Sequence, residues 1–124
     1  MRNTILLADD TEIIRELQRT ILGRFSEYEI EEFSNGNSLR NRLEGKIEDV
    51  SLVVTDNDMP GSKGSEIIAE YAGKSKFPFV LIYGGDEEIG EQAVRDGAFG
   101  YLRKPFEMRQ YAELIRKALE LSRD

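Results

Sequence analysis

The sequence lacks two residue types on which much protein chemistry depends, since its 124 residues include neither cysteine nor histidine. Without cysteine, the chain cannot form a disulfide, a thiolate nucleophile or a thiolate metal site. Without histidine, it cannot carry a serine–histidine–aspartate or cysteine–histidine catalytic site, and it lacks the usual ligands of zinc. The chemistry left to it rests on carboxylates, lysine, hydroxyl groups and hard cations.

Long apolar runs and excess positive charge are also missing. No stretch approaches the roughly 20 apolar residues of a membrane-spanning helix. The apolar segment that follows the first residues is too short for a signal peptide. Lys and Arg number 17 against 24 Asp and Glu, a formal charge of −7, which argues against non-specific binding to nucleic acid or to an anionic membrane. We therefore expect a cytoplasmic protein that binds neither. Its length predicts one domain over residues 1–124.

Short apolar segments alternate along the chain with segments of helical period. The strand candidates are residues 4–8, 29–33, 52–55, 79–83 and 100–102. The helix candidates are residues 13–25, 36–43, 65–71, 87–96 and 107–122. In the first helix, the pattern places Ile13 on the buried face and Gln18 on the polar face. Five strand–helix repeats, with two strands apolar throughout, predict an α/β fold with a doubly wound parallel sheet.

Charged residues follow three of the predicted strands. Asp9 and Asp10 follow the first strand, Asp56 ends the third, and Lys104 comes just after the fifth. In an open parallel sheet, the functional site lies beyond the carboxyl ends of the strands, where the winding direction changes. If the first and third strands are neighbours, three carboxylates meet there, and they cannot all stay ionised without a cation. A hard divalent ion such as Mg²⁺, which prefers oxygen ligands, fits this set.

Each cluster also has a simpler interpretation when it is taken alone. Asp9 and Asp10 are typical of a helix N-terminus, where acids accept hydrogen bonds from free amides. The stretch that begins at Asp56 is typical of a turn rich in Asx residues. Lys104 alone is typical of a solvated surface lysine. All three clusters stand at strand ends, however, and this coincidence favours a common site.

In this order and at this spacing, the motifs resemble those of the receiver domain of two-component response regulators, including the chemotaxis regulators. The motifs are Asp9-Asp10, then Asp56-x-x-Met59-Pro60-Gly61-x-x-Gly64, then Gly100-Tyr101-Leu102-x-Lys104-Pro105-Phe106. The resemblance spans the whole chain. It implies a flavodoxin-like fold of five parallel strands in the order 2-1-3-4-5 with five helices, and a signalling phosphoacceptor in place of an enzyme.

The resemblance assigns a role to each charged residue. Asp56 would accept a phosphoryl group from the phosphohistidine of a sensor histidine kinase or phosphotransfer protein, with Mg²⁺ as cofactor. Asp10 would bind the ion directly and Asp9 mainly through water. Asp56 and the backbone carbonyl of Asp58 would complete the ligand set. Lys104 would pair with Asp56 at rest and with the phosphoryl oxygens afterwards.

The chain departs from the receiver pattern at the end of the fourth predicted strand. Receivers usually carry threonine or serine there, whose hydroxyl binds the phosphoryl group and draws an aromatic side chain inward, but this chain has Tyr83. The aromatic residue itself is present as Tyr101. Tyr83 either reaches the phosphoryl group with its phenol, fills the space into which Tyr101 would move, or simply lines the core. We therefore expect phosphorylation with altered switching.

Two loop features at the same edge bear on this expectation. By the resemblance, Pro105 would follow a cis peptide bond that aims Lys104. Gly84 and Gly85 either give the loop after the fourth strand unusual dihedral angles close to the site, or form a tight turn before a helix that Asp86 caps.

Several functions remain open on the sequence. In a receiver, a change of charge at Asp56 would bias a surface made by the fourth helix, fifth strand and fifth helix, to which a downstream protein or output domain would bind. The sequence leaves open whether such a module stands alone, belongs to a longer regulator or forms a homodimer. Tyr83 favours a pseudo-receiver that binds partners without phosphorylation. A haloacid-dehalogenase-type phosphatase, with Asp56 and Asp58 as nucleophile and general acid, is disfavoured because its motif normally ends the first strand.

Overall fold

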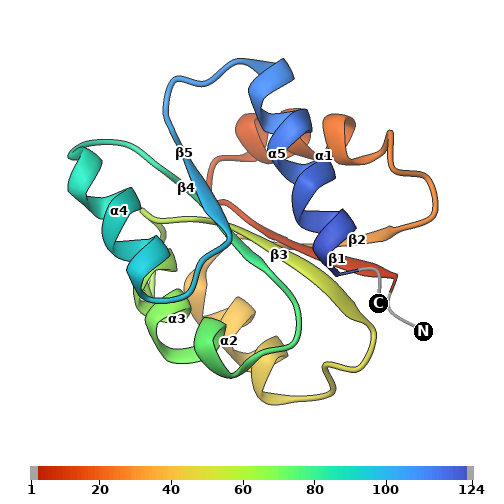
Figure 1. Cartoon of the computed structure of the whole chain (residues 1–124), viewed down its shortest axis with the longest axis horizontal. Coiled ribbons are helices and arrows are strands. Elements are labelled where there is room, and N and C mark those ends of the chain that lie inside the picture. The colour runs from red at the N-terminus through yellow and green to blue at the C-terminus, as the bar shows by residue number, and fades with distance from the viewer. Residues whose placement is uncertain (1–2, 123–124) are drawn as a thin grey trace.

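The apolar segments form one parallel sheet in the computed structural model, which describes residues 3–122 (Figure 1). The strands are β1 (Thr4–Ala8), β2 (Glu29–Phe33), β3 (Val50–Asp56), β4 (Phe79–Tyr83) and β5 (Gly100–Arg103). Their order across the sheet is β2-β1-β3-β4-β5. The predicted fold class and strand order are therefore confirmed.

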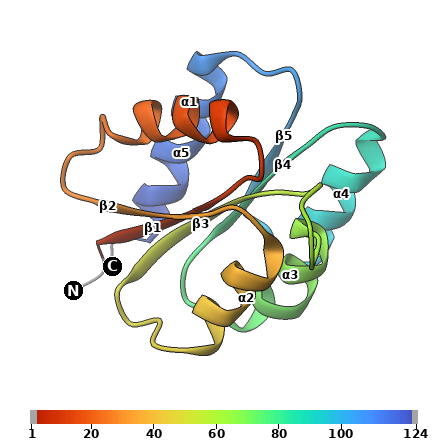
Figure 2. The same cartoon turned by 180° about the vertical axis from the view of Figure 1, so that it is seen from behind.

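Five α-helices cover the two faces of the sheet. They are α1 (Glu12–Leu22), α2 (Gly36–Glu44), α3 (Gly64–Tyr71), α4 (Glu87–Arg95) and α5 (Met108–Leu121), with a 3₁₀ turn η1 (Ala72–Lys74) after α3. Side chains of α1 and α5 pack into one apolar cluster, and those of α2, α3 and α4 pack into another on the opposite face (Figures 1 and 2). Within the described residues, every helix is too short or too polar to cross a membrane.

The strand and helix boundaries differ from the predicted ones in two informative places. β3 runs over Val50–Asp56 in place of residues 52–55, because its first residues already pair with β1 across a register irregularity. The first helix ends at Leu22, and Gly23 caps it through its backbone N–H, so that Phe25 lies beyond it. Neither difference moves a strand end at which a charged residue was predicted.

The predicted buried face of α1 was wrong at two positions. Ile13 is 74% exposed, whereas Gln18, expected on the polar face, is 1% exposed. The inward face of α1 runs through Gln18, Ile21 and Leu22, at the i, i+3, i+4 spacing of a helical stripe. Gln18 is a polar member of this stripe, so an apolar pattern alone did not reveal it.

The winding of the chain positions the candidate site. From β1 the chain moves outward to β2, then returns to the other side of β1 and continues in the opposite direction through β3, β4 and β5. The direction of winding thus changes between β1 and β3, both of which are buried throughout. Ligand sites of open parallel sheets lie beyond the carboxyl ends of such strands.

Candidate functional site

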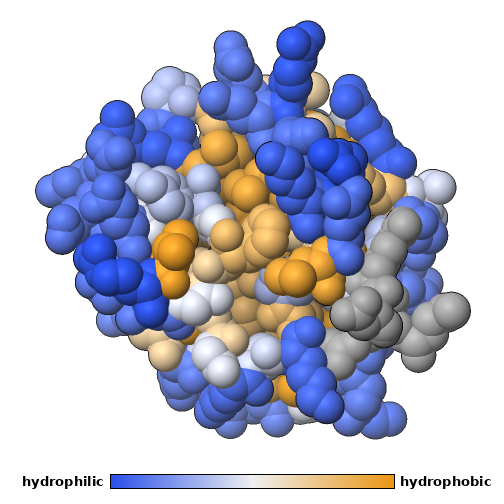
Figure 3. Space-filling view, in the orientation of Figure 1, coloured by the Kyte–Doolittle hydropathy of each residue, from blue (hydrophilic) through white to orange (hydrophobic). Residues whose placement is uncertain are grey.

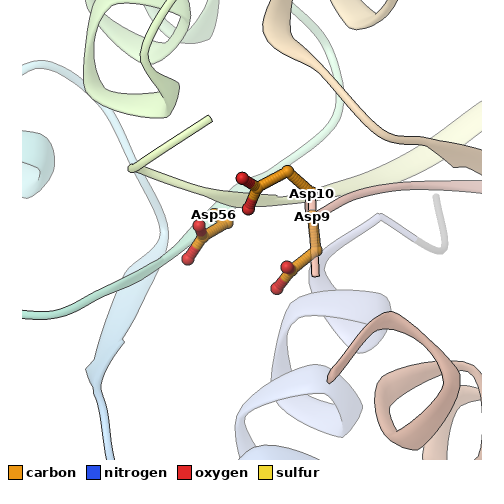
Figure 4. A group of neighbouring side chains, drawn as sticks. All are labelled: Asp9, Asp10 and Asp56. Carbon is orange, nitrogen blue, oxygen red and sulfur yellow. The ribbon is translucent and has the colours of Figure 1, made fainter. Parts of the chain in front are cut away.

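Three aspartates meet at the carboxyl ends of β1 and β3 (Figure 4). Asp9 and Asp10 directly follow β1, and Asp56 is the last residue of β3. One carboxylate oxygen from each lies within 4.8 Å of those of the other two. Asp9 and Asp56 are buried, whereas Asp10 is exposed. The fold therefore brings together the acids from two distant segments of the sequence.

Lys104 reaches the same group from the loop after β5. Its Nζ lies 2.7 Å from Asp56 Oδ1. The backbone N–H of Lys104 donates to the Tyr83 carbonyl (2.6 Å), and the peptide bond between Lys104 and Pro105 is cis. The lysine is thus anchored through its backbone to the end of β4 while its ammonium group contacts the acid on β3.

Burial sets the electrostatics of Asp56, which is only 2% exposed. Desolvation raises the pKa of its carboxyl from 3.8 to about 6, the Lys104 ammonium opposes this shift, and the negative charge of Asp9 adds to it. Burial also raises the pKa of Asp9. Burial lowers the pKa of Lys104, but the attraction of Asp56, together with the charges of Asp9 and Asp10, outweighs this effect, so that the pKa of Lys104 is raised. A further positive charge at this edge would stabilise all three carboxylates in their ionised form.

The donor set fits a hard divalent cation. All the groups are carboxylate oxygens, the type that Mg²⁺ prefers. Among the described residues, Asp56 Oδ1 receives no hydrogen bond of ordinary geometry and has only its close contact with Lys104, so this buried oxygen has capacity for a cation. The Asp58 side chain is exposed and lies outside the group of three. If Asp58 contributes a ligand, it does so through its backbone carbonyl.

The loop after β3 is tied to α3. The Asn57 side chain is buried, and its Oδ1 accepts a hydrogen bond from the backbone N–H of Ser65 (2.9 Å) in the first turn of that helix. At Gly64, a Cβ atom would lie 2.3 Å from the Asp56 carbonyl oxygen, so only glycine fits there. The spacing from Asp56 to Gly64 thus reflects close backbone packing that fixes where the Asp56 carboxylate stands.

Asp9 is held by two hydrogen bonds from outside the acidic group. The backbone N–H of Thr11 donates to its Oδ1 (2.9 Å), and the Gln18 amide donates to its Oδ2 (3.0 Å). Gln18 in turn accepts a hydrogen bond from the Tyr111 hydroxyl on α5 (2.8 Å). Sequence reasoning missed both of these residues as members of the site. Only the position of Gln18 within an otherwise apolar helical stripe could have drawn attention to it.

Tyr83 lies in the core beside the predicted switch residue. Its side chain is fully buried, its ring centre is 5.8 Å from that of Tyr101, and its hydroxyl donates to the backbone carbonyl of Glu87 on α4 (3.3 Å). Burial raises the pKa of this phenol. The Tyr101 ring packs directly on Gly90 of α4, where a Cβ atom would lie 2.4 Å from a ring carbon. Sequence reasoning also missed Gly90, because its role is to make room for the Tyr101 ring, which comes from a different element.

The loop between β4 and α4 is a turn that leads into a capped helix. Gly85 has a positive φ of 98°, a conformation that favours glycine. Asp86 is the N-cap of α4, and its carboxylate accepts a hydrogen bond from the backbone N–H of Glu88 (3.1 Å). The predicted cap is therefore confirmed. Nothing lies within 4 Å of a Cβ built on Gly84, so that glycine is not required by close packing.

Comparison with known proteins supports a single family. The model of the response regulator receiver domain matches residues 5–116. The chain is 32% identical to the chemotaxis protein CheY of Halobacterium salinarum over 125 residues, which cover 96% of this chain and 98% of that protein. It is also 32% identical to the transcriptional regulatory protein ResD of Bacillus subtilis over 124 residues, which cover 95% of this chain and 50% of that protein.

Solved structures agree with these matches. The chain superposes on a response regulator receiver domain protein from Clostridium thermocellum with a TM-score of 0.81 and 27% identity, over 95% of this chain and 94% of that one. The match covers between 16% and 50% of the length of the curated relatives that are transcriptional or biosynthesis regulators. The match to the regulator of Halobacterium salinarum, by contrast, extends over nearly all of both chains.

Proposed function

Since the chain belongs to the family of response regulator receiver domains of two-component systems, we propose that it accepts a phosphoryl group on Asp56 and signals through the surface it offers to partners. The observation that carries this proposal is the environment of one carboxylate. Asp56 stands at the end of β3, 2% exposed, with the Lys104 ammonium 2.7 Å away and two further acids beside it. The candidate nucleophile, a countercharge and the acids that would bind a cation thus lie together at the Asp56 carboxylate.

The transfer would form one bond and break another. A carboxylate oxygen of Asp56 would bond to phosphorus while the phosphorus–nitrogen bond of a phosphohistidine breaks and its electron pair leaves with the imidazole. The phosphohistidine would belong to a sensor histidine kinase or a phosphotransfer protein. Lys104 would move its ammonium from the Asp56 carboxylate to the phosphoryl oxygens, which its flexible stem allows.

A magnesium ion fits the acids described above. Asp10, Asp56 and the backbone carbonyl of Asp58 would hold it, with Asp9 beside them. When bound, the ion supplies positive charge that offsets the negative charge on the phosphoryl oxygens. Keeping Asp56 ionised without the ion costs free energy, because burial and the neighbouring Asp9 raise its pKa.

The surface formed by α4, β5 and α5 is the candidate docking face for a downstream protein or output domain. Apolar side chains gather on it over β5, between α4 and α5 (Figure 3). The same elements carry the exposed Val94 and Met108 and the partly buried Leu102 and Leu114. Tyr101 of β5 packs on α4 and so links this face to the core. Phosphorylation would bias this face through the loops above it.

Two other functions are weaker candidates. A pseudo-receiver, which binds partners without phosphorylation, is favoured by the fully buried Tyr83, which stands where receivers usually carry a small hydroxyl residue. A haloacid-dehalogenase-type phosphatase is disfavoured because Asp56 ends the third strand along the chain, whereas that motif normally ends the first.

Intact-mass measurement tests the proposal. The protein is incubated with Mg²⁺ and a small acyl phosphate such as acetyl phosphate, and its mass is compared with that of Asp56→Asn. We expect the mass of one phosphoryl group to be gained by the wild type and not by Asp56→Asn. Glu91→Gln is the matched control, because Glu91 is an exposed acid on α4 outside the group of three and its variant should still be modified. A wild type that gains no mass would support the pseudo-receiver.

A further inference from the structure

A chain of buried hydrogen bonds joins the acidic group to α5. The Asp9 carboxylate is fully buried, and its Oδ2 accepts a hydrogen bond from Gln18 Nε2 (3.0 Å) on α1. Gln18 Oε1 accepts from the Tyr111 hydroxyl (2.8 Å), which is also fully buried. The Tyr111 ring stacks on that of Phe106, with ring centres 5.4 Å apart. Three polar side chains from three segments thus form one connected path inside the core.

The path has a fixed direction because its Asp9 end accepts only one arrangement. The Asp9 carboxylate is an acceptor, so the Gln18 amide must turn its NH₂ group toward it. The amide oxygen then faces Tyr111, whose hydroxyl donates to it. Rotating the amide by half a turn would place its oxygen against the carboxylate and leave the buried NH₂ group with a poorer partner. The carboxylate thus sets the direction of the amide, and the hydrogen bond from Tyr111 holds Gln18 in that position.

We propose that Gln18 is a positioning residue for the cation site, that it fixes the Asp9 carboxylate beside Asp10 and Asp56, and that Tyr111 holds Gln18 for this task. Each Asp9 oxygen accepts one hydrogen bond, from Thr11 or from Gln18, and so keeps lone-pair capacity for a cation or a water bound to it. The proposal rests on the proposed function, since it requires that the three acids bind a divalent ion.

The place where the path ends distinguishes a positioning role for Gln18 and Tyr111 from a role in filling the core alone. Apolar side chains of similar size would fill the space of a glutamine and a tyrosine, and the surrounding residues of α1 and α5 are apolar. The polar pair instead ends on an acid that belongs to the group of three. Side chains that orient a metal ligand from behind typically change metal affinity by about 10–100-fold when they are lost.

The test compares Mg²⁺ affinity with stability in the double variant Gln18→Leu/Tyr111→Phe. Removing both partners together leaves no unpaired group between them, but Asp9 Oδ2 loses its buried donor, so the free energy of unfolding without metal should fall. The affinity for Mg²⁺, from a titration followed by backbone amide NMR shifts, should fall by about tenfold. Gln92→Leu is the matched control, because Gln92 lies on α4 and its exposed amide donates to Asp96 (3.1 Å) away from the acids. Its Mg²⁺ affinity should equal that of the wild type.

Each outcome decides one of the two proposals. If the wild type shows no Mg²⁺-dependent shifts, the proposed cation site itself is wrong. If the wild type binds Mg²⁺ and the folded double variant binds it equally well, Gln18 has no positioning role. Should the double variant not fold, Tyr111→Phe, which removes a single oxygen atom, replaces it in the titration. Its affinity should fall by less than tenfold, and an unchanged affinity would overturn the proposal.

Discussion

Two neighbouring regions at the carboxyl edge of the sheet differ in how closely they follow the receiver pattern. At the ends of β1 and β3, the acids and Lys104 stand together as the resemblance implies. At β4, α4 and β5, a buried Tyr83 and a tyrosine ring packed on Gly90 occupy the region in which receivers usually place a small hydroxyl residue and a mobile aromatic. From this contrast we predict that the proposed phosphorylation of Asp56 and the response to it depend on different residues, so that each can be altered alone.

The largest effect should come from an attempt to restore the usual residue with Tyr83→Thr. Tyr83 is among the largest fully buried side chains, so its loss opens a cavity beside Tyr101. We expect a loss of about 3 kcal/mol in the free energy of unfolding, measured with urea by circular dichroism. Tyr28→Thr, at a partly exposed tyrosine, should lose less. A loss under about 1 kcal/mol would mean that Tyr101 moves into the space, and the contrast between the regions would then be smaller than the structure indicates.

The acidic region should respond in the opposite direction to Asp56→Asn. The pKa of Asp56 is raised from 3.8 to about 6 in the folded protein, so folding favours the protonated form. The associated stability is fully present below pH 3.8 and is lost as the pH rises through about 6. Asparagine mimics the protonated acid at every pH. In metal-free buffer the variant should therefore equal the wild type near pH 4 and exceed it by about 3 kcal/mol above pH 7.

Urea unfolding at a series of pH values, with a chelator present, measures this difference. The gap between variant and wild type should open between pH 4 and 6 and stay constant above. Saturating Mg²⁺ should narrow it, because the cation stabilises the ionised wild type and has less to bind in the variant. A difference in stability between variant and wild type that does not depend on pH would show that burial does not raise the pKa of Asp56.

The sequence predicted the residues of the acidic site better than the residues that depend on tertiary packing. The acids and Lys104 lie directly at strand ends. Because strands are recognisable in a sequence as short apolar runs, the pattern predicted which strand end each of these residues follows. Gln18 and Gly90 could not be found in this way. Gln18 acts through Tyr111, 93 positions away, and Gly90 receives a ring from β5, so both depend on tertiary packing that no local pattern reports.

A smaller effect is expected from Gly90→Ala, which closes the recess under Tyr101. The added Cβ would lie 2.4 Å from a Tyr101 ring carbon, so the ring must move outward. We expect a net loss of about 1 kcal/mol, since overpacking costs about 1–3 kcal/mol and alanine gains about 1 kcal/mol over glycine in a helix. Acrylamide quenching of tyrosine fluorescence should show greater exposure of the ring.

Two further variants isolate this recess. Gly73→Ala is the control, because nothing lies within 4 Å of a Cβ built at Gly73, and its stability should not fall. In Gly90→Ala/Tyr101→Ala the clash is absent, so Gly90→Ala should cost nothing in that background. Phosphorylation by acetyl phosphate should be unchanged by Gly90→Ala alone. A slower reaction would mean that the position of Tyr101 influences the chemistry at Asp56 and would join the two regions into one.

The smallest effect should follow Tyr83→Phe, which asks whether the Tyr83 phenol belongs to the chemistry at all. The hydroxyl donates to the Glu87 carbonyl at 3.3 Å, a long hydrogen bond directed toward α4, so its loss should change stability by about 1 kcal/mol or less. Burial raises the pKa of the phenol, which therefore stays neutral near pH 7 and carries no charge to the site. We expect the rate of phosphorylation and the lifetime of the phosphorylated form, followed by intact mass, to match the wild type. A shortened lifetime at unchanged stability would show that the phenol reaches the phosphoryl group, because removing one oxygen that bonded only α4 has no other route to Asp56.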